Sequence, residues 1–398
     1  MTTVDTCQDA RAISDWIVRI RRQLHRFPEL MYKEVRTSQL VRDTLDELGI
    51  AYRYPLAETG VVATLGDGGR PCVALRADMD ALPIHEESDV DFRSEHDGEM
   101  HACGHDCHTA MLLGAARLLK EREADIRGTV RLIFQPAEEG GAGGKRMCDE
   151  GALAAEPPVR RIFGLHVWPL LPTGSFGARP GVFLAASSFV EIDVRGRGGH
   201  AAMPHQAIDP VATAAKIVNE LQTIVSRELN PLDSGVVSIT AIHGGEASNV
   251  IPETVQMRGT VRALSMDGLR FIQERVTAIA TDVAQAHRCE ADVLFVGHDY
   301  PPTVNDPECW ELAKAAASGL VGGENVQELP AVMGGEDFAY YTEQVPGCFV
   351  GLGVGNEAQG AVYGWHHPKF KVDEEALPLG AALHVAFALK SLSELRGN

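Results

Sequence analysis

The first third of the chain alternates between helical and strand-like spacings of apolar residues. Apolar positions recur three or four residues apart in three predicted helices, at residues 13–27, 37–48 and 109–120. Short apolar runs flanked by glycine or proline predict buried strands at residues 60–65, 71–75 and 128–134. This alternation favours an α/β domain with a largely parallel sheet covered by helices.

The pattern changes near residue 187, where apolar and polar residues alternate one by one as in a half-solvated strand. The elements predicted from there are a strand at 189–194, a helix at 209–229, strands at 236–241 and 254–262, a helix at 267–287 and a strand at 290–296. This β-α-β-β-α-β order is ferredoxin-like. We predict a main domain formed by residues 1–186 and 299–398, with an inserted α+β domain at 187–298 that acts as a lid or dimerisation surface.

The composition of the chain limits the kinds of binding partner and the cellular compartment that we expect. The 55 acidic and 36 basic residues give a formal charge of −19, which argues against nucleic acid or an anionic membrane as a partner. No signal peptide is recognisable and no run approaches 18 consecutive apolar residues, so we expect neither export nor a membrane span. The eight cysteines show no pairing pattern, which favours reduced thiols and a cytoplasmic protein.

Residues 100–108, with the sequence MHACGHDCH, place thiol and imidazole groups directly before a predicted helix. Thiolate and imidazole side by side bind first-row divalent metals well, so Cys103 and His105 are candidate ligands. The isolated histidines His166 and His366 are candidate partners. Each has a simpler interpretation, since a free cysteine is often a core residue and a lone histidine often makes only a hydrogen bond.

The adjacent acids Glu138 and Glu139 follow directly on a predicted buried strand. Neighbouring side chains on an extended segment diverge, so one carboxylate can bind a metal while the other acts as a base on a water molecule. The alternative is a solvated acidic loop before the glycine-rich residues 140–144. With the thiol and imidazoles, the pair predicts a hydrolytic metal centre.

Two further acidic pairs lie near the ends of predicted elements. Asp78 and Asp80 follow a strand and are spaced to face one side, where they could orient a ligating imidazole or simply cap a turn. Glu336 and Asp337 follow two glycines. They too could orient a ligating imidazole, or they could cap the N-terminus of the next segment.

The predicted insertion contributes polar candidates of its own. His200 and His205 lie on a glycine-flanked loop that could reach a substrate carbonyl and donate a hydrogen bond as negative charge develops there. Asn249 and Arg258 are candidates for holding a substrate carboxylate.

The chain resembles a known family over nearly its full length. It is similar to the hippurate hydrolase and N-acyl-amino-acid amidohydrolase branch of the aminoacylase/carboxypeptidase-type dinuclear metallopeptidases, and also to plant hydrolases of auxin–amino acid conjugates. The strings that carry the resemblance are RADMDALP at 76–83, MHACGHDCH at 100–108, FQPAEEG at 134–140, GLHVW at 164–168, GGHAA at 198–202, NVIP at 249–252, GGEDF at 334–338 and HHP at 366–368.

The resemblance implies a role for each main candidate. It implies Glu138 as general base and His200 as a contact to the scissile carbonyl, reached across a dimer or from a closing lid. The implied metal ligands are Cys103, His105, Glu139, His166 and His366. The neighbouring residues His108, His205, His367 and Cys107 are then more naturally structural or substrate-lining.

The implied reaction is metal-dependent cleavage of an N-acyl-amino acid, a small molecule, into a carboxylic acid and a free amino acid. Two divalent ions per subunit would serve it: the donor set suits zinc, the resemblance makes manganese a candidate beside it, and cobalt or nickel are alternatives. A carboxypeptidase or dipeptidase with the same centre is the main competitor. A non-catalytic metal-containing binding protein is the alternative from a different class.

Overall fold

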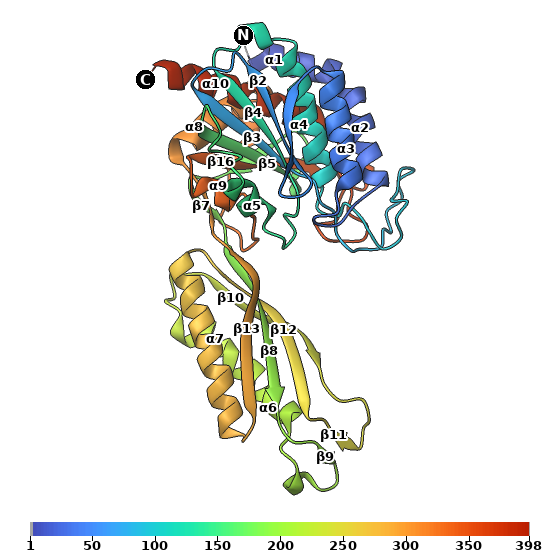
Figure 1. Cartoon of the computed structure of the whole chain (residues 1–398), viewed down its shortest axis with the longest axis vertical. Helices are drawn as coiled ribbons and strands as arrows, with labels where there is room; N and C mark the ends of the chain where they lie inside the picture. Colours follow the sequence, from blue (N-terminus) through green and yellow to red (C-terminus); the bar gives the residue numbers. More distant parts are fainter. Residues whose placement is uncertain (1–2, 398) are drawn as a thin grey trace. The chain divides into compact units, whose positions relative to one another are not determined.

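The computed structural model describes residues 3–397, which divide into two compact units (Figure 1). The first consists of the described residues of Met1–Phe183, Val304–Pro330 and Asp337–Asn398, and the second of Leu184–Thr303 and Ala331–Glu336. The second unit therefore extends a few residues beyond the segment 187–298 at either end, and it takes in a short return segment.

The first unit is built on an eight-stranded sheet with a parallel centre. In spatial order the strands are β1 (Ala51–Leu56), β2 (Gly60–Gly66), β4 (Thr129–Gln135), β3 (Cys72–Asp78), β5 (Val159–Pro172), β16 (Gly347–Gly355), β6 (Phe176–Ala178) and β15 (Val326–Glu328). The pairs β4–β3, β3–β5 and β5–β16 are parallel, whereas β1–β2 and β2–β4 are antiparallel. Every residue of β3 and β4 is buried, which is consistent with the short apolar runs at residues 72–75 and 132–134.

Helices cover this sheet, and α4 and α10 pack on each other and against β3 (Figure 1). The helices are α1 (Thr3–Ala12), α2 (Ser14–Arg26), α3 (Val35–Glu47), α4 (His105–Lys120), α5 (Gly143–Asp149), α8 (Pro307–Val321), α9 (Ala339–Thr342) and α10 (Leu377–Gly397). Short 3-10 turns lie at Glu123–Asp125, Gly323–Asn325, Glu357–Gln359 and Glu374–Ala376. A Cβ on Gly380 of α10 would lie 2.1 Å from Sδ of Met111 in α4, so the two helices meet where one has no side chain. The predicted α/β fold class is confirmed.

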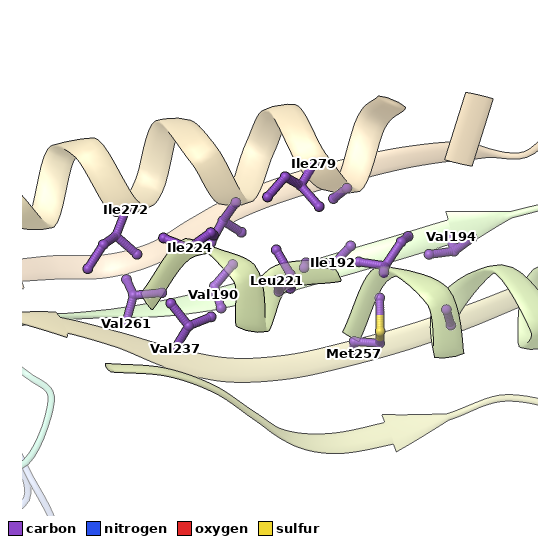
Figure 2. Packing of buried hydrophobic residues seen from close by; sticks show 14 of the residues in the cluster. Val190, Ile192, Val194, Leu221, Ile224, Val237, Met257, Val261, Ile272 and Ile279 are labelled. Atoms are coloured by element: carbon purple, nitrogen blue, oxygen red, sulfur yellow. The ribbon is translucent and has the colours of Figure 1, made fainter. Parts of the chain in front are cut away.

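The second unit is a four-stranded antiparallel sheet with two helices on one face (Figures 1 and 2). Its elements are β8 (Ala186–Arg195), β9 (Gly199–His200), a 3-10 turn (Pro204–Gln206), α6 (Pro210–Thr223), a π-helical turn (Ile224–Glu228), β10 (Gly235–His243), β11 (Val250–Ile251), β12 (Thr254–Ala263), α7 (Met266–Ala286) and β13 (Glu290–Tyr300). The sheet order β10-β12-β8-β13 and the interleaved helices give the ferredoxin-like arrangement. Where the chain enters and leaves the unit, β7 (Gly181–Leu184) pairs with β14 (Thr303–Asn305).

Alternation along β8 explains which face of this sheet is buried. Val190, Ile192 and Val194 point into the core with Leu221 of α6 and Ile279 of α7 (Figure 2). The residues between them are half-exposed or exposed on the opposite face, which gives the period-two pattern seen in the sequence.

One described segment, Glu374–Gly397, is long and apolar enough to cross a membrane by length and composition. Its most apolar window is 83% buried inside the protein. It includes α10, which packs between α4 and α8 as a core helix does. The segment is therefore accounted for by packing in the first unit.

A buried histidine in α10 makes stability sensitive to acid. The ring of His384 packs edge-on against Phe163, and within residues 3–397 neither of its nitrogens has a hydrogen-bond partner. Burial lowers the pKa of His384 to about 3. In the unfolded chain the group takes up a proton below a pH of about 6.5, while in the folded protein it stays neutral at pH 5. Stability is therefore lost as the pH falls through this window.

We expect this one group to lower the free energy of unfolding by about 2 kcal/mol between pH 7 and pH 5. In His384→Leu, whose side chain has no proton to take up, the loss over the same interval should be smaller by that amount. Urea unfolding of both proteins at the two pH values measures the difference. An identical pH dependence in the two proteins would show that another group is responsible.

Candidate metal centre

Cys103 and His105 lie where a loop meets the first turn of α4. Gly104 between them has a φ of +95°, and a Cβ there would lie 2.4 Å from Cγ2 of Val167. Only glycine fits this close approach to β5. The helix begins immediately after this glycine, four residues earlier than predicted, so His105 belongs to its first turn and is fully buried.

His166 comes from β5, the parallel neighbour of β3 and β16. Its Nδ1 donates to the carbonyl oxygen of Val167 at 2.8 Å. This bond fixes the ring orientation and leaves Nε2 as the atom that can bind a metal. That Nε2 lies 3.4 Å from Sγ of Cys103.

Glu138 and Glu139 follow the carboxyl end of β4. The buried carboxylate of Asp80 holds both backbone N–H groups: Glu138 donates to its Oδ1 at 3.1 Å and Glu139 to its Oδ2 at 2.9 Å. Asp80 Oδ1 also lies 3.2 Å from Nδ1 of His105. One side chain thus ties the acidic pair to the first turn of α4.

His366 lies on a loop of the same unit, in a left-handed conformation with φ of +62°. Its N–H donates to the carbonyl of Ala102 at 2.9 Å, which holds this loop against the segment before Cys103. About half of its side chain is exposed, and its Nε2 lies 3.2 Å from Oε1 of Glu139. The exposed side of the cluster is therefore the side on which His366 lies.

The first unit brings together six predicted residues from four separate stretches of chain. Potential ligand atoms lie within 4.8 Å of one another in three overlapping groups, namely Cys103, His105 and His166; Cys103, Glu139 and His366; and His105, Glu138 and Glu139. One thiol, three imidazoles and a carboxylate form a mixed sulfur, nitrogen and oxygen donor set that suits divalent first-row metals.

Two atoms of this cluster are polar, buried and unsatisfied. Within residues 3–397, neither Nε2 of His105 nor Oε1 of Glu139 makes a hydrogen bond. The contact from Glu139 to His366 is close enough for an ion pair but lacks hydrogen-bond geometry. An unsatisfied buried polar atom typically costs about 1–3 kcal/mol, and a bound cation would satisfy both atoms. The residues present therefore fit a metal.

Negative charge dominates the surroundings of the candidate ligands. Burial lowers the pKa of His105, but the carboxylates of Asp78 and Asp80 outweigh it and raise the value to about 10. Burial, reinforced by Glu139 and other nearby carboxylates, raises the pKa of the Cys103 thiol well above its usual value. A divalent cation binding here would displace protons and offset this excess of negative charge.

His108, one turn along α4, is engaged through both ring nitrogens. Its Nδ1 donates to Asp78 Oδ1 at 2.5 Å, and its Nε2 accepts the N–H of Val167 at 2.9 Å. It therefore joins α4 to β3 and β5 and has no nitrogen left for a metal. Asp78 also accepts from Arg76 at 2.8 Å, whereas its nearest approach to His105 is 3.7 Å. Of the two predicted acids, Asp80 is the one in hydrogen-bond range of a candidate ligand.

The other neighbouring residues are held by contacts of their own. The ring of His367 stacks on Tyr363 with centroids 4.4 Å apart, and its Nδ1 accepts from the backbone of Lys369. Cys107 is buried within α4. His205 lies exposed in the 3-10 turn of the second unit.

Asp337 lies in a buried polar network and is not the N-cap that its position had suggested; Phe338 occupies the N-cap position of α9. The Asp337 carboxylate accepts from Arg76 at 2.9 Å, from Gln135 at 2.8 Å and from the N–H of Gly144 at 2.7 Å. Its own N–H donates to Oε1 of Glu138 at 3.4 Å. This contact to the candidate base was missed because no spacing in the sequence joins residues 199 positions apart.

Three candidates lie in the second unit. His200 on β9 pairs with Val250 on β11, and the carbonyl of Asn249 accepts the N–H of Ala201 at 3.0 Å, so His200 and Asn249 are close together. His200 is exposed. Arg258 lies on β12, where its Nε is 3.2 Å from Glu191 on the solvent face of the sheet.

Comparisons with known proteins agree with these features. The model of peptidase family M20/M25/M40 matches residues 74–390. The chain is 46% identical over 387 residues to IAA-amino acid hydrolase ILR1-like 4 of Arabidopsis thaliana, covering 96% of this chain and 87% of the relative. It is 40% identical to thermostable carboxypeptidase 1 of Saccharolobus solfataricus over 96% of this chain and 97% of the relative.

Among solved structures, a dinuclear metal-binding peptidase of Bacillus subtilis matches with a TM-score of 0.80 and 37% identity, covering 96% of this chain and 99% of that one. The predicted resemblance to an amidohydrolase branch of the metallopeptidases is thereby confirmed. The chain belongs to peptidase family M20/M25/M40.

Proposed function

We propose that this protein is a metal-dependent amidohydrolase that cleaves N-acyl-amino acids into a carboxylic acid and a free amino acid. The observation that carries the proposal is the convergence of Cys103, His105, Glu139, His166 and His366 in overlapping groups, one of which joins His105 and Glu139 to Glu138. As the substrate class we propose hippurate-like, N-acetyl or indole-acetyl amino acids, and the 46% identity to a plant IAA-amino acid hydrolase supports the indole-acetyl conjugates.

We propose that the five ligands hold two divalent ions, either manganese or zinc, with cobalt or nickel as alternatives. Two overlapping groups of ligand atoms share Glu139, and the similar Bacillus subtilis peptidase is named as a dinuclear metal-binding protein. Ions bound there would make water a stronger acid and polarise the acyl carbonyl. Asp80 would hold the His105 ring and the backbone of both acids in place.

Proton transfer then falls to Glu138. Its carboxylate takes a proton from the water that attacks the amide carbon, and it returns that proton to the leaving nitrogen when the C–N bond breaks. The products are one carboxylic acid and one free amino acid. The N–H of Asp337 donates to Oε1 of Glu138, which orients the carboxylate for both transfers.

For the second unit we propose that His200 donates a hydrogen bond to the acyl oxygen as charge develops there, and that Asn249 and Arg258 hold the substrate carboxylate. Replacing His200 by alanine should lower kcat by about 10²–10³-fold, the usual effect of removing one such donor. His287→Ala, a change at an exposed histidine at the end of α7 in the same unit, is the control. Equal activity of the two variants, with equal metal content, would contradict the role of His200.

We propose further that the second unit acts as a lid or as the surface of a homodimer. The sheet face opposite α6 and α7 carries exposed apolar side chains, Phe189 and Leu294, which supports an interaction surface there. Size-exclusion chromatography with light scattering separates a dimer from a monomer.

The experiment that tests the function is hydrolysis of a substrate panel by metal-stripped protein refilled with Mn²⁺ or Zn²⁺. The panel contains benzoyl-glycine, acetyl-methionine, indole-acetyl-alanine and a free dipeptide. Metal-restored cleavage of the acyl conjugates is the expected result. The identity to a thermostable carboxypeptidase makes peptidase activity the second candidate, and cleavage of the dipeptide alone would select it. Metal binding without any cleavage would favour a binding protein.

A further inference from the structure

The backbone that presents Glu138 and Glu139 leaves β4 through an unfavourable conformation. Ala137 has a φ of +55°, in the left-handed region where a residue with a Cβ is strained. Strain of this kind persists only where surrounding groups hold the backbone in place. The groups that hold this turn therefore decide where the two carboxylates point.

Three consecutive N–H groups in this turn each donate to a buried carboxylate. Asp80 accepts those of Glu138 and Glu139, as described above. The N–H of Ala137 donates to Oε1 of Glu34 at 2.9 Å. Glu34 is fully buried and comes from the residue before α3, 103 positions away.

Glu34 is held in place by its own segment and by the turn between β1 and β2. Its Oε2 accepts the hydroxyl of Thr59 at 2.6 Å, and its Oε1 also accepts the N–H of Tyr32 at 3.0 Å. The hydroxyl of Tyr32 in turn donates to the carbonyl of Gly141 at 2.7 Å, farther along the same loop. Although Glu34 occupies the N-cap position of α3, its side chain makes no capping bond to that helix.

The position of Glu34 is electrostatically unfavourable. Burial, together with the nearby carboxylate of Asp80, raises the pKa of Glu34 to about 7. A side chain that served only to fill this space would be more stable there as an apolar or neutral group. The hydrogen bond that the carboxylate accepts from the strained turn explains why an acidic residue occupies this position.

We propose that Glu34 is a positioning residue that, together with Asp80, fixes residues 137–139 and thereby aims the base Glu138 and the ligand Glu139. The inference rests on the proposed function for the roles of those two acids. Glu34 itself touches neither substrate nor metal, and it acts through the N–H of Ala137.

The test compares Glu34→Ala and Glu34→Gln with Glu29→Gln. Glu29 lies in the same segment and its carboxylate accepts the N–H groups of Arg36 and Thr37 at the start of α3, so it is a matched control that supports local structure only. We expect Glu34→Ala to lower kcat at saturating Mn²⁺, or the Mn²⁺ affinity, by about 10–100-fold. This is the usual loss when a group that orients metal ligands through hydrogen bonds is removed. KM should change less than kcat.

Glu34→Gln distinguishes a loss of positioning from a folding defect, because glutamine fits the same space and keeps one oxygen that can accept the N–H of Ala137. It should show a smaller loss in the same direction at an unchanged melting temperature. Glu29→Gln should stay within about twofold of the parent protein in both kcat and Mn²⁺ affinity.

The inference is overturned if both Glu34 variants keep kcat and Mn²⁺ affinity within about twofold, or if Glu29→Gln loses as much as they do. Mn²⁺ affinity, measured by calorimetry, is independent of the substrate panel. If the parent protein binds Mn²⁺ but cleaves no acyl conjugate, the proposed function fails while the affinity comparison still decides the role of Glu34.

Discussion

Replacing Glu138 by glutamine is expected to lower kcat by about 10²–10⁴-fold, the usual contribution of a general base. The amide has nearly the same size as the carboxylate, and its oxygen can still accept the N–H of Asp337. It cannot take up a proton at neutral pH, however, so the attacking water keeps its proton and the leaving nitrogen receives none. Because Glu138 is proposed to act on water, the variant should bind close to two metal equivalents.

The measurement pairs steady-state kinetics on benzoyl-glycine with elemental analysis of the same preparations. The control is Glu150→Gln, which changes an acidic residue of the same unit outside the cluster. The carboxylate of Glu150 accepts the N–H of Ala57, so this variant should leave kcat and metal content unchanged. A Glu138→Gln protein with near-parental kcat would remove Glu138 from the proton-transfer role.

Much of the fold could be predicted because its signals are local. The fully buried strands β3 and β4 contain short apolar runs, at residues 72–75 and 132–134, and the half-buried β8 alternates residue by residue. The change between these two patterns is visible near residue 187 without any knowledge of contacts. The order of elements after that point is sufficient for the ferredoxin-like arrangement.

The candidate ligands could be found for a related reason. Glu139 follows the end of β4. Cys103 comes just before Gly104, and His105 is the first residue of α4. In a parallel sheet the carboxyl ends of strands lie along one edge, so chemically reactive residues after different strands gather there. His166 and His366 were candidates on weaker local signals, and the family resemblance implied a ligand role for both.

The groups that orient the ligands could not be predicted in the same way. Glu34 and Asp337 reach the turn after β4 from 103 and 199 positions away, and neither distance leaves a periodic trace in the sequence. The left-handed conformations of Ala137 and His366 could not be predicted either, because neither residue is a glycine. Such contacts depend on which strands and loops become neighbours, which is a property of the tertiary structure.

Replacing Glu139 by alanine should affect the metal before it affects the chemistry. Glu139 shares one group of ligand atoms with Cys103 and His366 and another with His105, so its loss removes a donor from both. We expect metal affinity to fall by more than about 100-fold. This exceeds the loss that is typical when a residue that hydrogen-bonds to a metal ligand is removed. Activity should be at background in the protein as purified and should return only in part at high Mn²⁺.

Comparison with Glu138→Gln makes this result decisive, because the two acids are adjacent, share the support of Asp80 and are proposed to have different roles. Loss of metal from Glu139→Ala alone, with metal kept and turnover lost in Glu138→Gln, is the expected pattern. Equal metal loss in both would mean that both carboxylates are ligands and that another group moves the proton. Metal retained in Glu139→Ala would exchange the roles of the two acids, since the carboxylate still present would then have to be the ligand.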